Sequence, residues 1–325
     1  MITGENIGEK MNKLISLYKK MFLIRKSEEV IIENYFDDDM KTPMHMSMGS
    51  EAIAAGVCEA INDGDQVFGT FRSHAPYLAK TGDLDGFFAE MYGKKDGCCE
   101  GKSGSMHLCN MDKGYVSSSA IVCSNVPVAV GAAFANKFKN NGKKVVVFFG
   151  DGAMEEGSFW ESINMASVWS LPILFVCEDN KLAVNTTTEC RQGYKDIGNI
   201  IEEFDIIHHS GSGFDAQFIE SVTSSTLKKM EETERPGFIK FEYYRQMEHV
   251  GVNSDAHEYY RKSDNKRFCS DKDPLAYMKS KLNICEIDVS DIEKEITKSI
   301  YEALENAKKS EFSPVSDLYK DVYYG

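Results

Sequence analysis

The fold of this chain is decided by the stretch Val145-Val146-Val147-Phe148-Phe149-Gly150-Asp151-Gly152 and by its counterpart Ile173-Leu174-Phe175-Val176-Cys177-Glu178-Asp179-Asn180. Each stretch begins with five apolar residues and ends in small or polar ones, and the segment between them has the length of one helix. Apolar runs of this kind are typical of buried parallel strands joined by a crossover helix. The pattern therefore predicts a strand–helix–strand unit that brings Asp151 and Asn180 to the same edge of a sheet.

The residues at these strand ends are suited to holding a metal and a phosphate. Carboxylate and amide oxygens, as on Asp151 and Asn180, are ligands that Mg²⁺ accepts. Gly150 and Gly152 have no side chain, so a ligand can approach the backbone closely, and the helix that follows would point free N–H groups toward a phosphate. Either half alone is explained equally well by a tight turn or a polar strand end. The two halves together indicate a site for a diphosphate and its metal.

The composition restricts the class of protein. The chain has 325 residues, of which 42% are hydrophobic and 27% charged, as expected for a globular enzyme with a sizeable core. Its net charge of −14 argues against nucleic acid or an anionic membrane as the main partner. Nine cysteines lack zinc-type spacing and are an odd number, which favours reduced thiols. Because residues 1–13 are polar and no apolar run could span a bilayer, we expect a cytoplasmic protein.

Strands alternate with helices along the chain, which predicts an α/β fold with a parallel sheet and helices on both of its faces. The expected helices lie at 8–36, 50–61, 84–91, 126–139, 215–232 and 284–309, and further strands at 67–71 and 237–244. Polar segments without periodicity, at 93–119, 183–199 and 249–273, are predicted to be loops. We expect one domain over residues 1–325, with an N-terminal helical segment at about 8–36 and a C-terminal one at about 284–325.

The segment from Gly150 to Asn180 resembles the thiamine diphosphate motif, which is GDG followed by NN about thirty residues later. Flanking blocks resemble the α subunit of E1, the 2-oxo acid dehydrogenase component, in its pyruvate and acetoin branch. In chain order these blocks are Met48-Gly49-Ser50-Glu51-Ala52, Phe71-Arg72-Ser73-His74, Gly101-Lys102-Ser103-Gly104-Ser105-Met106-His107, Ile121-Val122-Cys123-Ser124-Asn125-Val126-Pro127 and Glu248-His249-Val250-Gly251. The resemblance implies the thiamine diphosphate-binding fold.

The chain departs from the family pattern at a few positions. The departures are Asp179 for the first Asn of the motif, Leu182 for an aromatic residue, Ser117-Ser118-Ser119-Ala120 for a glycine-rich stretch, and Met247 for one histidine of a pair. The last two changes lie near the reacting end of the cofactor in the family. They leave the substrate open.

The resemblance also implies ligands for the metal and the diphosphate. Asp151 and Asn180 would bind Mg²⁺ through their side chains, and Leu182 would bind it through its backbone oxygen. Gly150, Gly152 and Ala153 would contact the diphosphate through the backbone. Arg72, next to Phe71, would pair with a diphosphate oxygen, because a guanidinium offers a fork of donors that suits phosphate.

The remaining implied site residues surround the reacting end of the cofactor. The backbone near Ala120 and Val122 would face the aminopyrimidine ring, and Ile121 would help to hold the cofactor bent. His45 and His249 would be the catalytic histidines that meet the substrate or the cofactor, since an imidazole exchanges protons at neutral pH.

Taken together, the resemblance implies the α subunit of a thiamine diphosphate-dependent E1-type enzyme that needs Mg²⁺. Such an enzyme decarboxylates a 2-oxo acid like pyruvate, or cleaves acetoin, and transfers the acyl or aldehyde unit to a lipoyl acceptor, with a lipoyl acyltransferase as a further partner. The family's activating glutamate lies on a second domain that α-type chains do not carry, so we expect an α₂β₂ heterotetramer with a β-type subunit. Two alternatives stay open: a biosynthetic carboligase or decarboxylase subunit without a lipoyl partner, and a non-catalytic subunit that only binds its partner.

Overall fold

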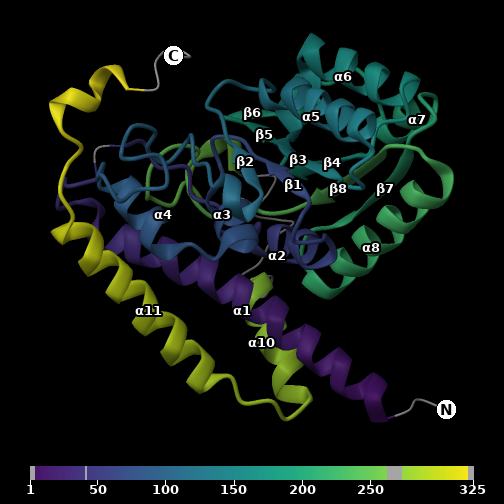
Figure 1. Ribbon diagram of the computed structural model, residues 1–325. Coiled ribbons are helices and arrows are strands. Elements are labelled where there is room, and N and C mark those ends of the chain that lie inside the picture. Colours follow the sequence, from purple (N-terminus) through teal and green to yellow (C-terminus); the bar gives the residue numbers. More distant parts are fainter. Residues whose placement is uncertain (1–3, 41, 262–272, 321–325) are drawn as a thin grey trace.

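A six-stranded parallel sheet forms the centre of the protein, and the α/β prediction is confirmed (Figure 1). The computed structural model describes residues 4–40, 42–261 and 273–320. The strand order is β2-β1-β3-β4-β8-β7, and every neighbouring pair is parallel. The strands are β1 (Gln66–Phe68), β2 (Tyr115–Ser117), β3 (Val145–Gly150), β4 (Ile173–Asp179), β7 (Ile207–Ser212) and β8 (Gly237–Glu242).

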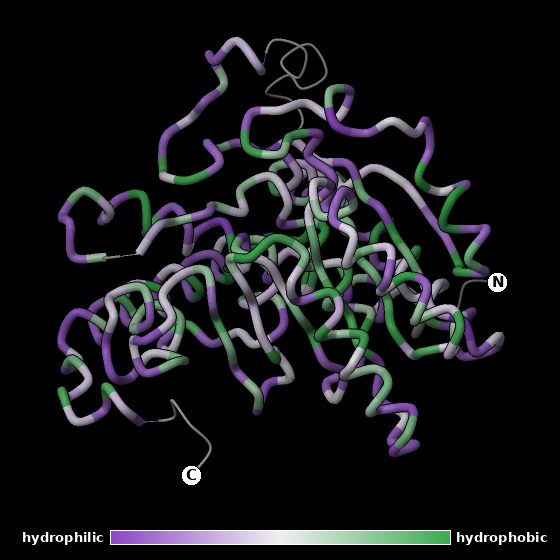
Figure 2. Tube along the Cα trace, turned by 90° about the horizontal axis from the view of Figure 1, so that it is seen from above, coloured by the Kyte–Doolittle hydropathy of each residue, from purple (hydrophilic) through white to green (hydrophobic). Residues whose placement is uncertain are grey.

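Helices cover both faces of the sheet, because alternate residues of each strand point to opposite sides. In β3, Val146 and Phe148 belong to one core, and Val145, Val147 and Phe149 belong to the other. The first core is covered by α1 (Gly4–Tyr35), α2 (Glu51–Ala60), α3 (His74–Thr81) and α8 (Ala216–Thr233). The second is covered by α5 (Asn125–Lys139), α6 (Gly157–Val168) and α7 (Ile197–Glu202). Figure 2 shows hydrophobic segments through the middle of the chain trace and hydrophilic ones at its edges.

The remaining helices pack against α1 or against a helix that itself packs against α1 (Figure 1). They are α4 (Leu84–Met91), α10 (Pro274–Ile284) and α11 (Ser290–Lys309), with short 3₁₀ turns η1 (Met111–Lys113), η2 (Asp151–Glu155), η3 (Thr188–Cys190), η4 (Tyr259–Arg261) and η6 (Val315–Tyr319). The α11 helix runs beside α1, and the Tyr301 hydroxyl donates a 2.6 Å hydrogen bond to Glu33. None of the helices in the described ranges combines the length and apolar character needed to span a bilayer.

The predicted helices and strands are present, with additions. The helices α3, α7 and α10 and the edge strands β2 and β7 were not predicted. The segment 183–199, expected as a loop, carries part of a small antiparallel hairpin formed by β5 (Leu182–Ala183) and β6 (Thr186–Thr187). Of the loop predicted at 249–273, residues 262–272 lie outside the described residues.

The strand order creates a crevice between β1 and β3. From β1 the chain passes to β2 on one side, and from β2 it crosses to β3 on the other side. In open parallel sheets, ligands bind beyond the carboxyl ends of the strands at such a switch point. Arg72 follows β1 and Asp151 follows β3, so the topology places both beside this crevice.

Candidate cofactor site

A cavity of about 270 Å³ lies beyond the carboxyl ends of β1, β3, β4 and β8. Its lining consists of Thr70, Phe71 and Arg72 after β1, Val122 and Cys123 before α5, residues 150–153 with Glu155 and Glu156 after β3, Glu178, Asn180 and residues 182–184 from β4 and β5, and Tyr243 and His249 after β8. Segments that are far apart in the sequence therefore meet at the predicted sheet edge.

Asp151 is the first residue of η2 and is buried, with 1% of its surface exposed. Burial, and next the charge of Asp179, raise its pKa to about 6, while Arg191 opposes the shift. The guanidinium of Arg191 lies 2.5 Å from Asp151 Oδ2 and also pairs with Glu155. The guanidinium of Arg191 therefore occupies a position next to the carboxylate that is predicted to bind the metal. This contact places a positive charge beside Asp151.

Asp179, which stands where the family motif has Asn, is neutralised by neighbouring lysines. Its buried carboxylate lies 2.7 Å from Lys181 Nζ and 3.4 Å from Lys240 Nζ. It also accepts a hydrogen bond of 3.0 Å from the backbone N–H of Lys181. The additional negative charge is therefore compensated within the chain.

Asn180 and Leu182, the other two predicted metal ligands, lie on the turn that follows β4. The Asn180 side-chain N–H donates to the Tyr243 hydroxyl at 3.1 Å, and its Oδ1 accepts from the backbone N–H of Leu182 at 3.0 Å. These contacts fix the orientation of the amide. Leu182 is held by its pairing with Thr187 in the β5–β6 hairpin. Both residues line the same cavity as Asp151.

Arg72 is a buried guanidinium beside this cavity, and burial lowers its pKa. Within the described residues its hydrogen bonds go to neutral carbonyl oxygens, those of Met46 and, at 3.3 Å, His249. Glu178 lines the same cavity, and burial raises its pKa to about 7, although Arg72 opposes the shift. In the described part of the chain, its buried Oε1 has no hydrogen-bond partner. A buried cation without an ionic partner is costly, so an anion would be well placed here.

His45, Phe71 and His249 form one aromatic cluster at the cavity. The ring centroid of His45 lies 4.7 Å from that of Phe71 and 5.3 Å from that of His249. Burial first, and then the charge of Arg72, lower the pKa of His45 to about 3 and that of His249 to about 4. Both imidazoles are therefore neutral at pH 7, and the buried Nδ1 of His45 has no hydrogen-bond partner among the residues that the structure describes.

The predicted aminopyrimidine segment lines the cavity only in part. Val122 contributes to the lining, whereas Ala120 and Ile121 lie outside it, and 72% of the Ile121 surface is exposed. Sequence reasoning assigned no role to Arg191, Glu178 or Tyr243. Glu178 adjoins the motif and was open to prediction, but nothing in the polar segment around Arg191 pointed to Asp151.

Comparison with known proteins identifies a family and several relatives. The family described as the dehydrogenase E1 component matches residues 19–316. The α subunit of acetoin:2,6-dichlorophenolindophenol oxidoreductase from Bacillus subtilis (strain 168) is 32% identical, over 99% of this chain and 97% of that protein. The pyruvate dehydrogenase E1 component subunit alpha of Rhizobium meliloti (strain 1021) is 28% identical, over 95% of this chain and 89% of that protein. The mitochondrial counterpart from Solanum tuberosum is 31% identical, over 96% of this chain and 80% of that protein.

Proposed function

The chain belongs to the dehydrogenase E1 component family, and on this basis we propose that it is the α subunit of a thiamine diphosphate-dependent E1-type enzyme. The observation that carries the proposal is the convergence of Asp151, Asn180 and Leu182 with the buried Arg72 on one cavity. Oxygen donors and a guanidinium together suit a metal-bound diphosphate. We treat residues 1–325 as one E1 α-type domain.

The residues present fit this cofactor. We assign the Mg²⁺ ligands to the side chains of Asp151 and Asn180 and the backbone oxygen of Leu182. Arg72 would pair with the diphosphate, whose oxygens would replace the neutral carbonyls as its strongest acceptors. The backbone from Gly150 to Ala153 would complete the contact. Among the described residues, no non-neighbouring atom lies within 4 Å of the position that a Cβ on Gly150 would take, so a ligand can reach the backbone there.

Thiamine diphosphate, when bound, supplies an electron sink for cleavage of the bond beside a carbonyl carbon. The chain's own residues bind, orient and move protons around it. Neutral His45 and His249 can each accept a proton or donate an N–H to a substrate oxygen at pH 7. Phe71 packs against both rings.

A β-type subunit is the partner that we infer from the family and from the surface. Ile121 and Val122 are exposed next to the cavity lining, and α5 and α6 also expose large apolar side chains. Such a surface suits burial against another chain. We infer an α₂β₂ heterotetramer that acts on a 2-oxo acid or on acetoin and passes the product to the lipoyl group of an acyltransferase.

The metal assignment is tested with Asp151→Asn, which removes the charge but keeps the shape, and with Asp151→Ala. Calorimetry with thiamine diphosphate and Mg²⁺ is expected to show a loss of affinity beyond the roughly 100-fold that second-shell substitutions can cause. Asp112→Ala, at an exposed position, serves as the control. Unchanged affinity in both Asp151 variants would overturn the assignment.

The acceptor and the partner are tested by reconstitution with a β-type subunit. Formation of an acylated lipoyl domain from a 2-oxo acid, or from acetoin, is the expected result. Formation of a hydroxyketone from an added aldehyde instead would favour a carboligase. Turnover by the single chain would show that the β-type subunit is not required.

A further inference from the structure

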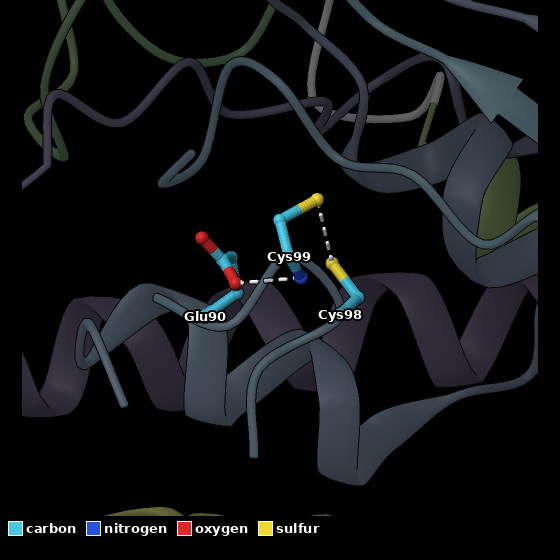
Figure 3. Close-up of side chains that lie close together, drawn as sticks. All are labelled: Glu90, Cys98 and Cys99. Carbon is cyan, nitrogen blue, oxygen red and sulfur yellow. Dashed lines mark hydrogen bonds between the residues drawn. The ribbon is translucent and has the colours of Figure 1, made fainter. Parts of the chain in front are cut away.

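Two adjacent thiols face each other on the loop after α4, away from the cofactor site. The Sγ atoms of Cys98 and Cys99 lie 4.0 Å apart, and both side chains are partly exposed (Figure 3). Together with a Glu90 oxygen, the two sulfurs lie within 4.8 Å of one another. None of these residues lines the cavity that contains Asp151.

The spacing of the two sulfurs matches the bite of a chelated ion. A Zn–S bond of about 2.3 Å and a tetrahedral angle require the two sulfurs to be about 3.8 Å apart. The observed separation of 4.0 Å is close to that value. Chelation would therefore need only a small rotation of the side chains.

The surroundings of the sulfurs favour a thiolate on Cys99. The hydrogen bond from Cys98 is the largest cause that lowers the pKa of Cys99 to about 7, and Ser103 adds to it. The same bond raises the pKa of Cys98, which keeps its proton and donates it to Cys99. Burial and the charge of Glu90 oppose the lowering of the Cys99 pKa. The backbone of Cys109 supports negative charge on both sulfurs. Metal ions bind the thiolate form, so one ligand is ready at neutral pH.

Glu90 is a positioning residue and not a metal ligand. Its buried Oε2 accepts hydrogen bonds from the backbone N–H groups of Cys99 and Gly101, both at 2.9 Å. Its Oε1 accepts from those of Ser103 at 2.8 Å and Gly104 at 2.9 Å. Four bonds fill the four lone-pair sites of a carboxylate. Glu90 therefore fixes the backbone that carries Cys99.

We propose that Cys98 and Cys99 form a chelating site for one soft divalent cation of the Zn²⁺ and Cd²⁺ class. Both sulfurs bind as thiolates, the displaced S–H protons pass to solvent, and water fills the remaining positions around the ion. Soft cations prefer thiolate over the oxygen ligands around Asp151. The proposal does not depend on the proposed function.

The test is a titration of the reduced, metal-free full chain with Cd²⁺, followed by the ultraviolet thiolate-to-cadmium absorption band. Oxygen ligands do not produce this band, so binding at Asp151 does not interfere. One tight equivalent of Cd²⁺ is expected, with Zn²⁺ as a competitor. Cys98→Ser and Cys99→Ser should each weaken binding at least tenfold, because one thiolate of the chelate is lost. The control Cys285→Ser removes an exposed thiol outside the pair, and it should bind Cd²⁺ as the wild type does.

A melting measurement separates a lost ligand from a lost fold. Cd²⁺ should raise the melting temperature of the wild type and of Cys285→Ser more than that of the two chelate variants, since the native state holds both sulfurs at the chelating distance. The metal-free melting temperatures of all four proteins should agree closely. Absence of a tight equivalent, or wild-type binding by Cys99→Ser, would overturn the proposal.

Discussion

The charge of each buried side chain at the cofactor site is set by its immediate neighbours. Asp179 introduces a carboxylate where the family motif has an amide, and the chain supplies Lys181 and Lys240 within 3.4 Å of it. Asp151 is paired with Arg191. Arg72, by contrast, bonds to carbonyl oxygens. Arg72, which has no ionic partner among the described residues, therefore lies where the diphosphate is proposed, and the paired carboxylate lies where the metal is proposed.

His249 gives a prediction at the scale of one residue. Its pKa in the folded chain is about 4, against 6.5 for an exposed histidine, mainly because of burial. Between these values the unfolded chain binds a proton that the folded chain does not, so this stabilisation is complete above pH 6.5 and is lost as the pH falls toward 4. From pH 7 to pH 5 the loss is on the order of 2 kcal/mol before solvent screening.

The variant His249→Gln has no titratable group at position 249. Its free energy of unfolding should therefore fall less than that of the wild type between pH 7 and pH 5. Urea unfolding of the metal-free chain at the two pH values measures the difference. His257→Gln, at an exposed histidine, should behave like the wild type. Equal losses in the wild type and His249→Gln would contradict the neutral state of this half-buried imidazole.

At the scale of elements, the central strands could be predicted and the edges could not. The strands β3 and β4 are apolar runs buried on both faces, so composition alone marks them. The edge strand β7 reads Ile207-His208-His209-Ser210-Gly211-Ser212 and is held by its pairing with β8, which sequence does not display. The helix α3 has eight residues, with Pro76 in its first turn, and is too short to show periodicity.

At the site, contacts that follow from the local sequence pattern could likewise be predicted, whereas contacts between distant segments could not. Asp151 and Asn180 stand at the ends of predicted strands, so their meeting at one sheet edge follows from the pattern. The contact between Arg191 and Asp151 depends on how the segment after β6 folds back over η2, and no local pattern determines that path.

Arg191 gives a prediction for this segment. We expect Mg²⁺ to displace the guanidinium from Asp151, so that the segment moves when the cofactor binds. Arg191→Gln should raise the affinity for thiamine diphosphate with Mg²⁺ about tenfold, because an ion pair no longer has to be broken. It should also lower the stability of the metal-free chain by on the order of 3 kcal/mol, because Asp151 becomes a buried unpaired charge.

Calorimetry and urea unfolding of the metal-free chain measure the two effects of Arg191→Gln. Lys195→Gln, at an exposed position in the same segment, is the matched control and should change neither quantity. A fall in cofactor affinity would instead show that Arg191 is itself a ligand of the cofactor.

At the scale of the whole molecule, the two faces of the sheet are covered to different depths. On one side, α2 and α8 pack on the sheet, and α1, α10 and α11 lie beyond them (Figure 1). On the other side, α5 and α6 form the outer layer and present apolar side chains to solvent. On α5 these are Val128, Phe134 and Phe138, of which Phe134 and Phe138 are four residues apart and stack on one helix face. Trp169, after α6, packs against Phe134 with ring centroids 5.1 Å apart.

This face gives the last prediction, that Phe138→Asp prevents assembly with a β-type subunit. The Phe138 side chain is 84% exposed in the single chain, so the substitution should leave its melting temperature within about 2 °C of the wild type. In the assembly the new carboxylate would be buried without a partner, at a cost of several kcal/mol, or a loss of affinity of 100-fold or more. Ile284→Asp, at the end of α10 on the opposite side of the molecule, is equally exposed and should assemble normally. Sedimentation velocity of the co-expressed subunits distinguishes the outcomes, and a heterotetramer that forms normally with Phe138→Asp would exclude this face from the interface.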